Sequence, residues 1–254
     1  MDNRPIGIFD SGIGGVTILK CLLAKMPNEN YIYYSDSKHN PYGEKTKEEV
    51  LGFVDQIINY FIEKDCKAIV FACNTATALA IDEMRKKHPD LLLIGTEPAY
   101  KMIHDYAPNT KTLVMATPAT IESERFQNLY HHYDNQRPYL LACPNLAYLI
   151  EENKEEELTS YLRQLLGPFQ QENIESVVLG CTHYPLIIEK IEAILGKVKF
   201  YDGGEGIANH LYHLLESNHQ LNLNKAKKEI YFEDSNHNEQ KKERFFAFLT
   251  ELQK

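Results

Sequence analysis

Cysteines, long apolar runs and basic clusters are all scarce in this sequence. It has five cysteines in 254 residues and no C-x-x-C pair, which argues against a disulfide framework and against a structural zinc site. No apolar run approaches the ~20 residues needed to cross a bilayer. Asp10 interrupts the apolar stretch that begins at Ile6, so no secretion signal is expected. These absences favour a cytoplasmic protein whose cysteines act as thiols.

The charge balance is acidic and gives little reason to expect nucleic acid or an anionic membrane as a partner. Lys and Arg total 27 against 36 Asp and Glu, a net charge of −9, and no run of Lys or Arg stands out. The content of 43% hydrophobic and 25% charged residues is ordinary for a globular protein. The length suits one large domain or two of roughly 100–130 residues each.

Short apolar runs alternate with amphipathic segments along the chain. The clearest helix is predicted for about residues 47–64, where Thr46 and Glu49 form a capping box. The predicted strands are apolar on both faces, as in buried parallel sheets, so we predict an α/β fold. These strands are Ile6–Phe9, Tyr31–Tyr34, Ala68–Ala72, Leu91–Gly95, Thr112–Ala116, Val177–Gly180 and Val198–Tyr201. A further strand, Glu229–Glu233, is predicted after a polar segment.

An internal sequence similarity, or echo, suggests that the chain is built from two similar halves. Residues 68–75 resemble residues 176–183: each segment is a strand, then Cys, then two hydrogen-bonding residues before a helical pattern. A weaker echo relates residues 6–12 to residues 113–119 at nearly the same offset. Chance similarity between buried strands is the alternative. We predict two similar α/β domains with mainly parallel sheets.

The expected domain boundaries follow from where each half begins. The first domain comprises residues 1–97 together with a returning C-terminal tail, 208–254, and the second comprises residues 98–207. A polar segment, a strand and a closing helix make up the tail, which is expected to pack on the first half.

Two cysteines, Cys73 and Cys181, each lie between a predicted strand and the start of a predicted helix. At such a helix start the pKa of a thiol can fall from about 8.5 to roughly 3.5–7.5. Two matched thiols facing each other suit the removal of a proton from a carbon acid and its return on the opposite face, which inverts the stereocentre. Cys21, Cys66 and Cys143 lack this placement and are predicted to be small buried core residues.

Polar side chains beside these two cysteines suit a small zwitterionic substrate. Asp10 and Ser11 are candidates to bind an ammonium group. His183 is a candidate for proton transfer, with a merely structural role as the alternative. Side-chain donors for carboxylates are Asn74, Thr75, Thr117, Thr120 and Thr182.

Competing motifs are weak. In the glycine-rich stretch 12–17, Thr17 occupies the third glycine position of a dinucleotide-binding motif, and Asp10 would repel a pyrophosphate. His131 and His132 lack ligand spacing, so no metal site is predicted.

Six stretches resemble the cofactor-independent aspartate/glutamate racemase family, and the resemblance covers nearly the whole chain. They are Ile6–Leu19, Asn40–Thr46, Ile69–Ala80, Ala116–Ser123, Ala142–Glu151 and Val177–Ile187. The two cysteine motifs together are the most specific. The resemblance implies two α/β domains related by a pseudo-twofold axis, with the active site in the cleft between them. Departures from the family pattern occur at residues 38–40, Thr96 and Tyr148, and none removes a catalytic group.

The resemblance also implies residue roles. Cys181 would deprotonate L-glutamate and Cys73 would deprotonate D-glutamate, assisted by His183 and Asp10 respectively, with Glu151 orienting His183. The residues implied to bind substrate are Ser11, Tyr42, Gly43, Asn74, Thr75, Thr120 and Thr182.

Beyond the site, the resemblance implies no pyridoxal phosphate, metal or other cofactor, a homodimer, and a supply of D-glutamate for peptidoglycan synthesis. An interaction with DNA gyrase is implied by family analogy alone. The alternatives are racemisation of aspartate or another carbon acid, and a non-enzymatic binding or regulatory protein on the same fold.

Overall fold

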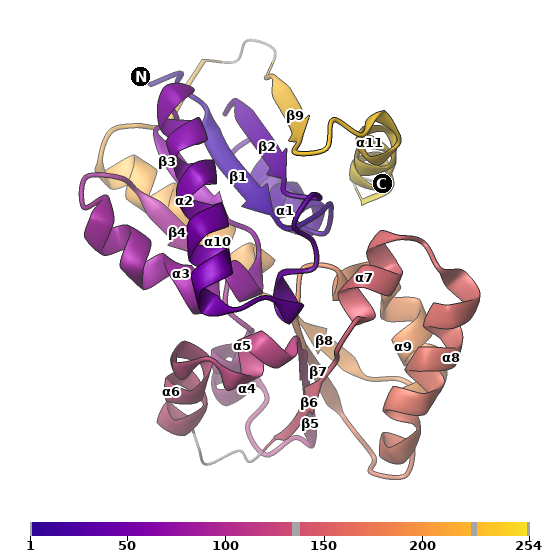
Figure 1. The fold of residues 1–254 in the computed structure, drawn as a ribbon. Coiled ribbons are helices and arrows are strands. Elements are labelled where there is room, and N and C mark those ends of the chain that lie inside the picture. Colours follow the sequence, from indigo (N-terminus) through magenta and orange to yellow (C-terminus); the bar gives the residue numbers. More distant parts are fainter. Residues whose placement is uncertain (1, 134–137, 225–227, 253–254) are drawn as a thin grey trace.

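The structure, a computed structural model, describes residues 2–133, 138–224 and 228–252 and contains two β-sheets (Figure 1). Every strand pairing among these residues is parallel, so the predicted α/β class is confirmed. The strands are β1 (Ile6–Asp10), β2 (Tyr31–Ser35), β3 (Ala68–Phe71), β4 (Leu93–Gly95), β5 (Thr112–Ala116), β6 (Tyr139–Ala142), β7 (Ser176–Gly180), β8 (Lys199–Tyr201) and β9 (Ile230–Asp234).

Helices connect successive strands. The α-helices are α1 (Val16–Lys25), α2 (Lys47–Glu63), α3 (Asn74–Lys87), α4 (Tyr100–Tyr106), α5 (Pro118–Glu122), α6 (Glu124–His132), α7 (Leu146–Glu151), α8 (Glu155–Leu166), α9 (Ile188–Leu195), α10 (Gly204–Ser217) and α11 (Glu239–Leu252). Short 3₁₀ turns cover Tyr42–Glu44, Gly167–Phe169 and Tyr184–Ile187.

Four strands of the first sheet and the four described strands of the second share one order, and β9 extends the first sheet. The first is β4-β3-β1-β2-β9, and the second, followed from β8, is β8-β7-β5-β6. The opening strand of each half, β1 or β5, therefore lies in the interior of its sheet, and β3 corresponds to β7. This correspondence of strand order confirms the prediction of two similar halves. The two segments differ after the strand: α3 begins directly after Cys73, whereas Cys181 is followed by a turn and the 3₁₀ helix Tyr184–Ile187, so the helix start predicted next to Cys181 is wrong.

Helices cover both faces of each sheet. In the first sheet, Ile8 packs with α1, α10 and α11, while Phe9 on the opposite face packs with α2 and α3. In the second, Val114 packs with α4 and α6, and Met115 packs with α7, α8 and α9. A strand that is buried on both faces appears in the sequence as a continuous apolar run. Most of the strands could therefore be predicted from the sequence.

One strand, β6, was not predicted. It lies at an edge of the second sheet, paired only with β5 among the described strands, and its four residues are exposed or half-buried. The sequence there lacks the flanking signals of a buried strand, so its apolar residues could not be assigned to one.

The tail returns to the first sheet. β9 pairs with β2, and Phe245 of α11 packs against Tyr33 and Phe232, with ring centroids 4.4 and 4.7 Å apart. α10 is continuous from Gly204 to Ser217, so the predicted boundary at 207/208 falls inside this helix. Among the described helices, none combines the length and apolar character that crossing a bilayer requires.

Candidate active site

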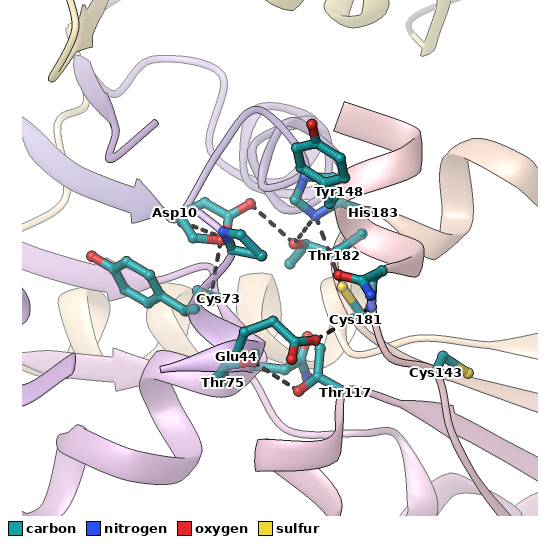
Figure 2. A pocket seen from close by; sticks show the side chains of 17 residues that line it. Asp10, Glu44, Cys73, Thr75, Thr117, Cys143, Tyr148, Cys181, Thr182 and His183 are labelled. Atoms are coloured by element: carbon teal, nitrogen blue, oxygen red, sulfur yellow. Dashed lines mark hydrogen bonds between the residues drawn. The ribbon is translucent and has the colours of Figure 1, made fainter. Parts of the chain in front are cut away.

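Loops at the carboxyl ends of both sheets face one another and enclose a small pocket (Figure 2). β1 and β3 of the first sheet lead to Asp10 and Cys73, and β5 and β7 of the second lead to Thr117 and Cys181. The carboxyl ends of parallel strands are the usual place for working residues. The pocket brings together the two cysteines that the sequence singled out.

Most of the residues predicted for the site line this pocket. They are Asp10, Ser11, Tyr42, Gly43, Cys73, Asn74, Thr75, Thr117, Cys181, Thr182 and His183. Two predicted residues lie behind the lining. Thr120 accepts a hydrogen bond from Thr117 at 2.9 Å, and Glu151 lies 2.8 Å from the His183 ring.

Cys73 caps the start of α3 with its sulfur atom. The sulfur accepts the backbone N–H of Ala76 at 3.5 Å and donates to the Ser11 hydroxyl at 3.9 Å. Burial and the negative charge of Asp10 raise the pKa of this thiol well above its ordinary value. The lowered pKa expected from the helix start is therefore wrong for Cys73, because burial outweighs the Ala76 N–H. Cys73 is suited to donate a proton.

Cys181 belongs to a buried relay with His183 and Glu151. Its sulfur lies 3.8 Å from His183 Nδ1, and His183 Nε2 lies 2.8 Å from Glu151 Oε2. Burial lowers the pKa of His183, but the hydrogen bonds to Cys181 and Glu151 raise it well above its ordinary range. Burial favours neutral Glu151, yet its contact with His183 holds the pKa of this carboxyl at about 2.

Asp10 links the two halves of the site. Its carboxylate accepts the N–H groups of Ser11 at 2.8 Å and Gly15 at 2.7 Å, and the hydroxyl of Thr182 at 3.0 Å. Burial raises the pKa of Asp10, although the charge of His183 and these donors oppose the effect. Because Thr182 follows β7, the bond between Asp10 and Thr182 crosses from one sheet to the other.

Threonine hydroxyls form a second link on the opposite side of the pocket. Thr75 and Thr117, from α3 and the start of α5, lie 2.9 Å apart between their Oγ1 atoms. Thr117 also accepts the N–H of Thr120 at 3.2 Å and so caps α5. These hydroxyls are donors that an anion entering the pocket can engage.

The glycines between β1 and α1 allow close contact with the relay. A Cβ at Gly12 would lie 2.5 Å from Glu151 Oε2, and one at Gly14 would overlap the His183 ring. The intervening Ile13 N–H donates to Glu151 Oε2 at 3.1 Å. The loop therefore needs glycine where the backbone approaches these side chains.

The pocket is nearly closed. Its cavity volume is about 20 Å³, room for roughly one or two water molecules. A molecule as large as an amino acid needs more space.

The mouth of the pocket contains residues that the sequence analysis missed. Asn145 donates its N–H to Glu44 Oε1 at 3.3 Å, which bridges the halves, and Tyr148 is 37% exposed beside it. The further lining residues are Pro41, Glu44, Cys143, Asn145, Ala147 and Tyr148. The only sequence signal for these residues was that segments 40–46 and 142–151 belong to the stretches that resemble the family.

Cys143, predicted to be a core residue, lines the pocket without presenting a reactive thiol. Its sulfur donates to the carbonyl of Leu141 at 3.3 Å, and burial raises its pKa to about 12. Cys21 and Cys66 lie outside the pocket. In the ranges that the structure describes, no three His, Cys, Asp or Glu side chains are grouped as metal ligands would be.

Comparisons with known proteins agree on one family. The family model described as Asp/Glu/hydantoin racemase matches residues 17–211. The chain is 44% identical over 231 residues to a glutamate racemase of Clostridium perfringens, covering 89% of each chain.

Solved structures extend the likeness to the whole fold. A glutamate racemase of Francisella tularensis in complex with D-glutamate superposes with a TM-score of 0.84 at 35% identity, covering 98% of this chain and 95% of that one. A glutamate racemase isoform of Bacillus anthracis superposes with a TM-score of 0.87 at 27% identity, with the same coverage.

Proposed function

Because this chain belongs to the Asp/Glu/hydantoin racemase family, we propose that it interconverts L-glutamate and D-glutamate. Relatives named glutamate racemase support glutamate as the substrate, including one solved with D-glutamate. Racemisation of aspartate by the same chemistry is the second candidate, since the family model is named for both amino acids.

The observation that carries the proposal is the pair of thiols in one closed pocket. Cys73 and Cys181 follow equivalent strands of two similar sheets and line the same pocket (Figure 2). An α carbon held between them has one sulfur on each face. General acid–base catalysis requires such groups within reach of the transferred proton.

In the L-to-D direction Cys181 acts as the base and Cys73 as the acid. The Cys181 thiolate removes the α proton, and the electron pair of the broken C–H bond passes to the α carbon. The Cys73 thiol then gives its proton to the opposite face, forming the new C–H bond. Cys181 ends as a thiol and Cys73 as a thiolate, so charge is balanced, and the D-to-L direction reverses each step. No cofactor enters this scheme.

The supporting residues divide between the two thiols. His183, held by Glu151, lies 3.8 Å from the Cys181 sulfur and assists Cys181, and the carboxylate of Asp10 assists Cys73. Two groups of residues bind the substrate: Ser11, Tyr42, Gly43, Asn74 and Thr75 from the first half, and Thr117, Thr120 and Thr182 from the second.

Incubation of the purified protein with L-glutamate under reducing conditions, with L-aspartate in parallel, tests the substrate. Equal amounts of D- and L-glutamate are expected at equilibrium, because enantiomers have equal free energy. Racemised aspartate with untouched glutamate would keep the two-thiol chemistry and replace the substrate. Folded, reduced protein that leaves both amino acids unchanged would contradict the proposal.

Other aspects of the proposed role depend on the family resemblance alone. They are the supply of D-glutamate to peptidoglycan synthesis, a homodimer and an interaction with DNA gyrase, whereas a cytoplasmic location was predicted from the sequence itself. Sedimentation of the purified chain tests the homodimer directly.

A further inference from the structure

The C-terminal helix α11 packs on the first sheet and lies near α7 of the second half (Figure 1). Two cationic side chains of α11 reach this second half. Phe245 and Leu249 of this helix are buried in the core of the first sheet. Lys241 and Arg244, three residues apart and hence on one side of the helix, contact the end of α7. This contact lies directly behind Glu151.

The two carboxylate oxygens of Glu151 have separate partners. Lys241 Nζ donates to Oε1 at 3.0 Å, whereas Oε2 lies 2.8 Å from His183 Nε2 and accepts the Ile13 N–H at 3.1 Å. The side chain of Glu151 is 1% exposed and that of Lys241 is 17% exposed. A cation on the first half of the molecule therefore bonds to the carboxylate that orients His183 on the second.

Arg244 holds the backbone at the same place. Its guanidinium donates to the carbonyl of Ile150 at 2.7 Å and to the carbonyl of Glu151. α7 has six residues and ends at Glu151, and the carbonyls at a helix end lack partners within the helix. Arg244 thus anchors the helix end, and Lys241 engages the side chain.

Given the proposed racemase function, we propose that Lys241 is a positioning residue that acts through Glu151. Lys241 binds Oε1 of Glu151 and leaves Oε2 to His183. Its positive charge also limits how strongly Glu151 stabilises the proton on His183. The C-terminal helix of the first half thereby completes the Cys181 side of the site.

The positive charge of Lys241 determines the direction of its effect on the protonation of His183. A buried carboxylate facing an imidazolium favours the charged ring, and a cation on the far side of the carboxylate reduces that preference. Charged and titratable groups that face the pair from the surrounding elements are Asp10, Glu152, Cys181, Lys241 and Arg244. Removal of the positive charge of Lys241 is expected to raise the pH at which His183 titrates by about one unit.

The test replaces Lys241 by Met in the full chain and follows His183 by NMR with labelled histidine, its signal assigned by loss in His183→Gln. Lys241→Gln is a second neutral variant, and Lys241→Arg keeps the cation. Lys242→Met is the matched control. It removes the same charge from the same helix, but Lys242 pairs with the exposed Glu239 at 3.3 Å and not with Glu151. The pH profile of kcat/KM for glutamate is recorded for each variant.

A higher titration midpoint in both neutral variants, with neither Lys241→Arg nor Lys242→Met moving it, is the expected result. The alkaline limb of the kcat/KM profile, where His183 loses its proton, should move upward by about the same amount, equally in both directions, because the enantiomers have equal free energy. An unchanged or lowered midpoint would overturn the proposal, even if thermal stability falls. The NMR titration of His183 does not depend on enzymatic activity. A wild-type protein inactive on glutamate would therefore contradict the proposed function, and the titration would still test the role of Lys241.

Discussion

Cys73 and Cys181 differ in their surroundings although the strands that carry them are equivalent. Cys73 faces Ser11 and the charge of Asp10, whereas Cys181 faces His183. The sequence echo predicted the matched placement of the two thiols. It could not predict the pKa of Cys73, because the burial of this sulfur depends on contacts with residues distant in the sequence, such as Ser11.

Cys73→Ser should remove most of the racemase activity. A serine hydroxyl neither donates nor accepts the α proton as readily as a thiol, so kcat is expected to fall about 10²–10⁴-fold, measured as loss of the L enantiomer by chiral chromatography. Cys66→Ser changes a buried thiol outside the pocket and serves as the control. Activity of Cys73→Ser within a few-fold of the wild type would contradict the assignment.

Gly14→Ala should displace His183 while the fold is retained. The added Cβ would overlap the His183 ring, and misplacement of a catalytic group by about 1 Å can reduce a rate about 100-fold. Gly52→Ala in α2 is the control, since its Cβ meets nothing within 4 Å and alanine favours a helix. The measurements are kcat/KM and circular dichroism; a Gly14→Ala protein as active as Gly52→Ala would show that the close contact is dispensable.

Among the secondary-structure elements, local signals decided which ones could be predicted. α2 carries its own start signal, and the structure contains the predicted capping box between Thr46 and Glu49. β6 has no such signal, because its place at the sheet edge is decided by pairing with β5. The contact of α11 with α7 could not be predicted from the sequence either. Lys241 and Glu151 are distant in the chain, and no local pattern relates their positions.

Thr46→Ala should destabilise the protein without changing its activity. It removes the hydroxyl that accepts the Glu49 N–H at 3.2 Å, and the loss of such a cap costs about 1 kcal/mol. Urea unfolding measures this cost, with Thr46→Ser, which keeps the hydroxyl, as the reference. Equal free energies of unfolding for the two variants would contradict the capping assignment.

For the whole molecule, closure of two halves over one pocket is the main consequence of the repeated fold. Contacts across the pocket include Asp10 with Thr182 and Thr75 with Thr117. The predicted domain limits, 1–97 with 208–254 and 98–207, stay a prediction. The sequence indicated two halves through its echo, but the degree of closure depends on side-chain contacts between residues far apart in the chain.

Alkylation of Cys73 and Cys181 should be slow and limited by opening of the pocket. The cavity of about 20 Å³ leaves little room for a reagent beside either sulfur. Peptide mass spectrometry after treatment with iodoacetamide should give rates at least tenfold below those of the urea-unfolded chain, and glutamate should slow them further. Rates equal to those of the unfolded chain would mean that the pocket is open in solution.

The most direct test of the account follows solvent deuterium during the first turnovers of unlabelled L-glutamate in D2O. Two thiols on opposite faces predict that the newly formed D-glutamate carries deuterium at the α carbon while the remaining L-glutamate stays unlabelled. This result requires that the group that removes the proton is not the group that returns it. Early D-glutamate that retains the original proton, or deuterium that enters L-glutamate as fast as D-glutamate forms, would contradict a reaction carried by Cys73 and Cys181.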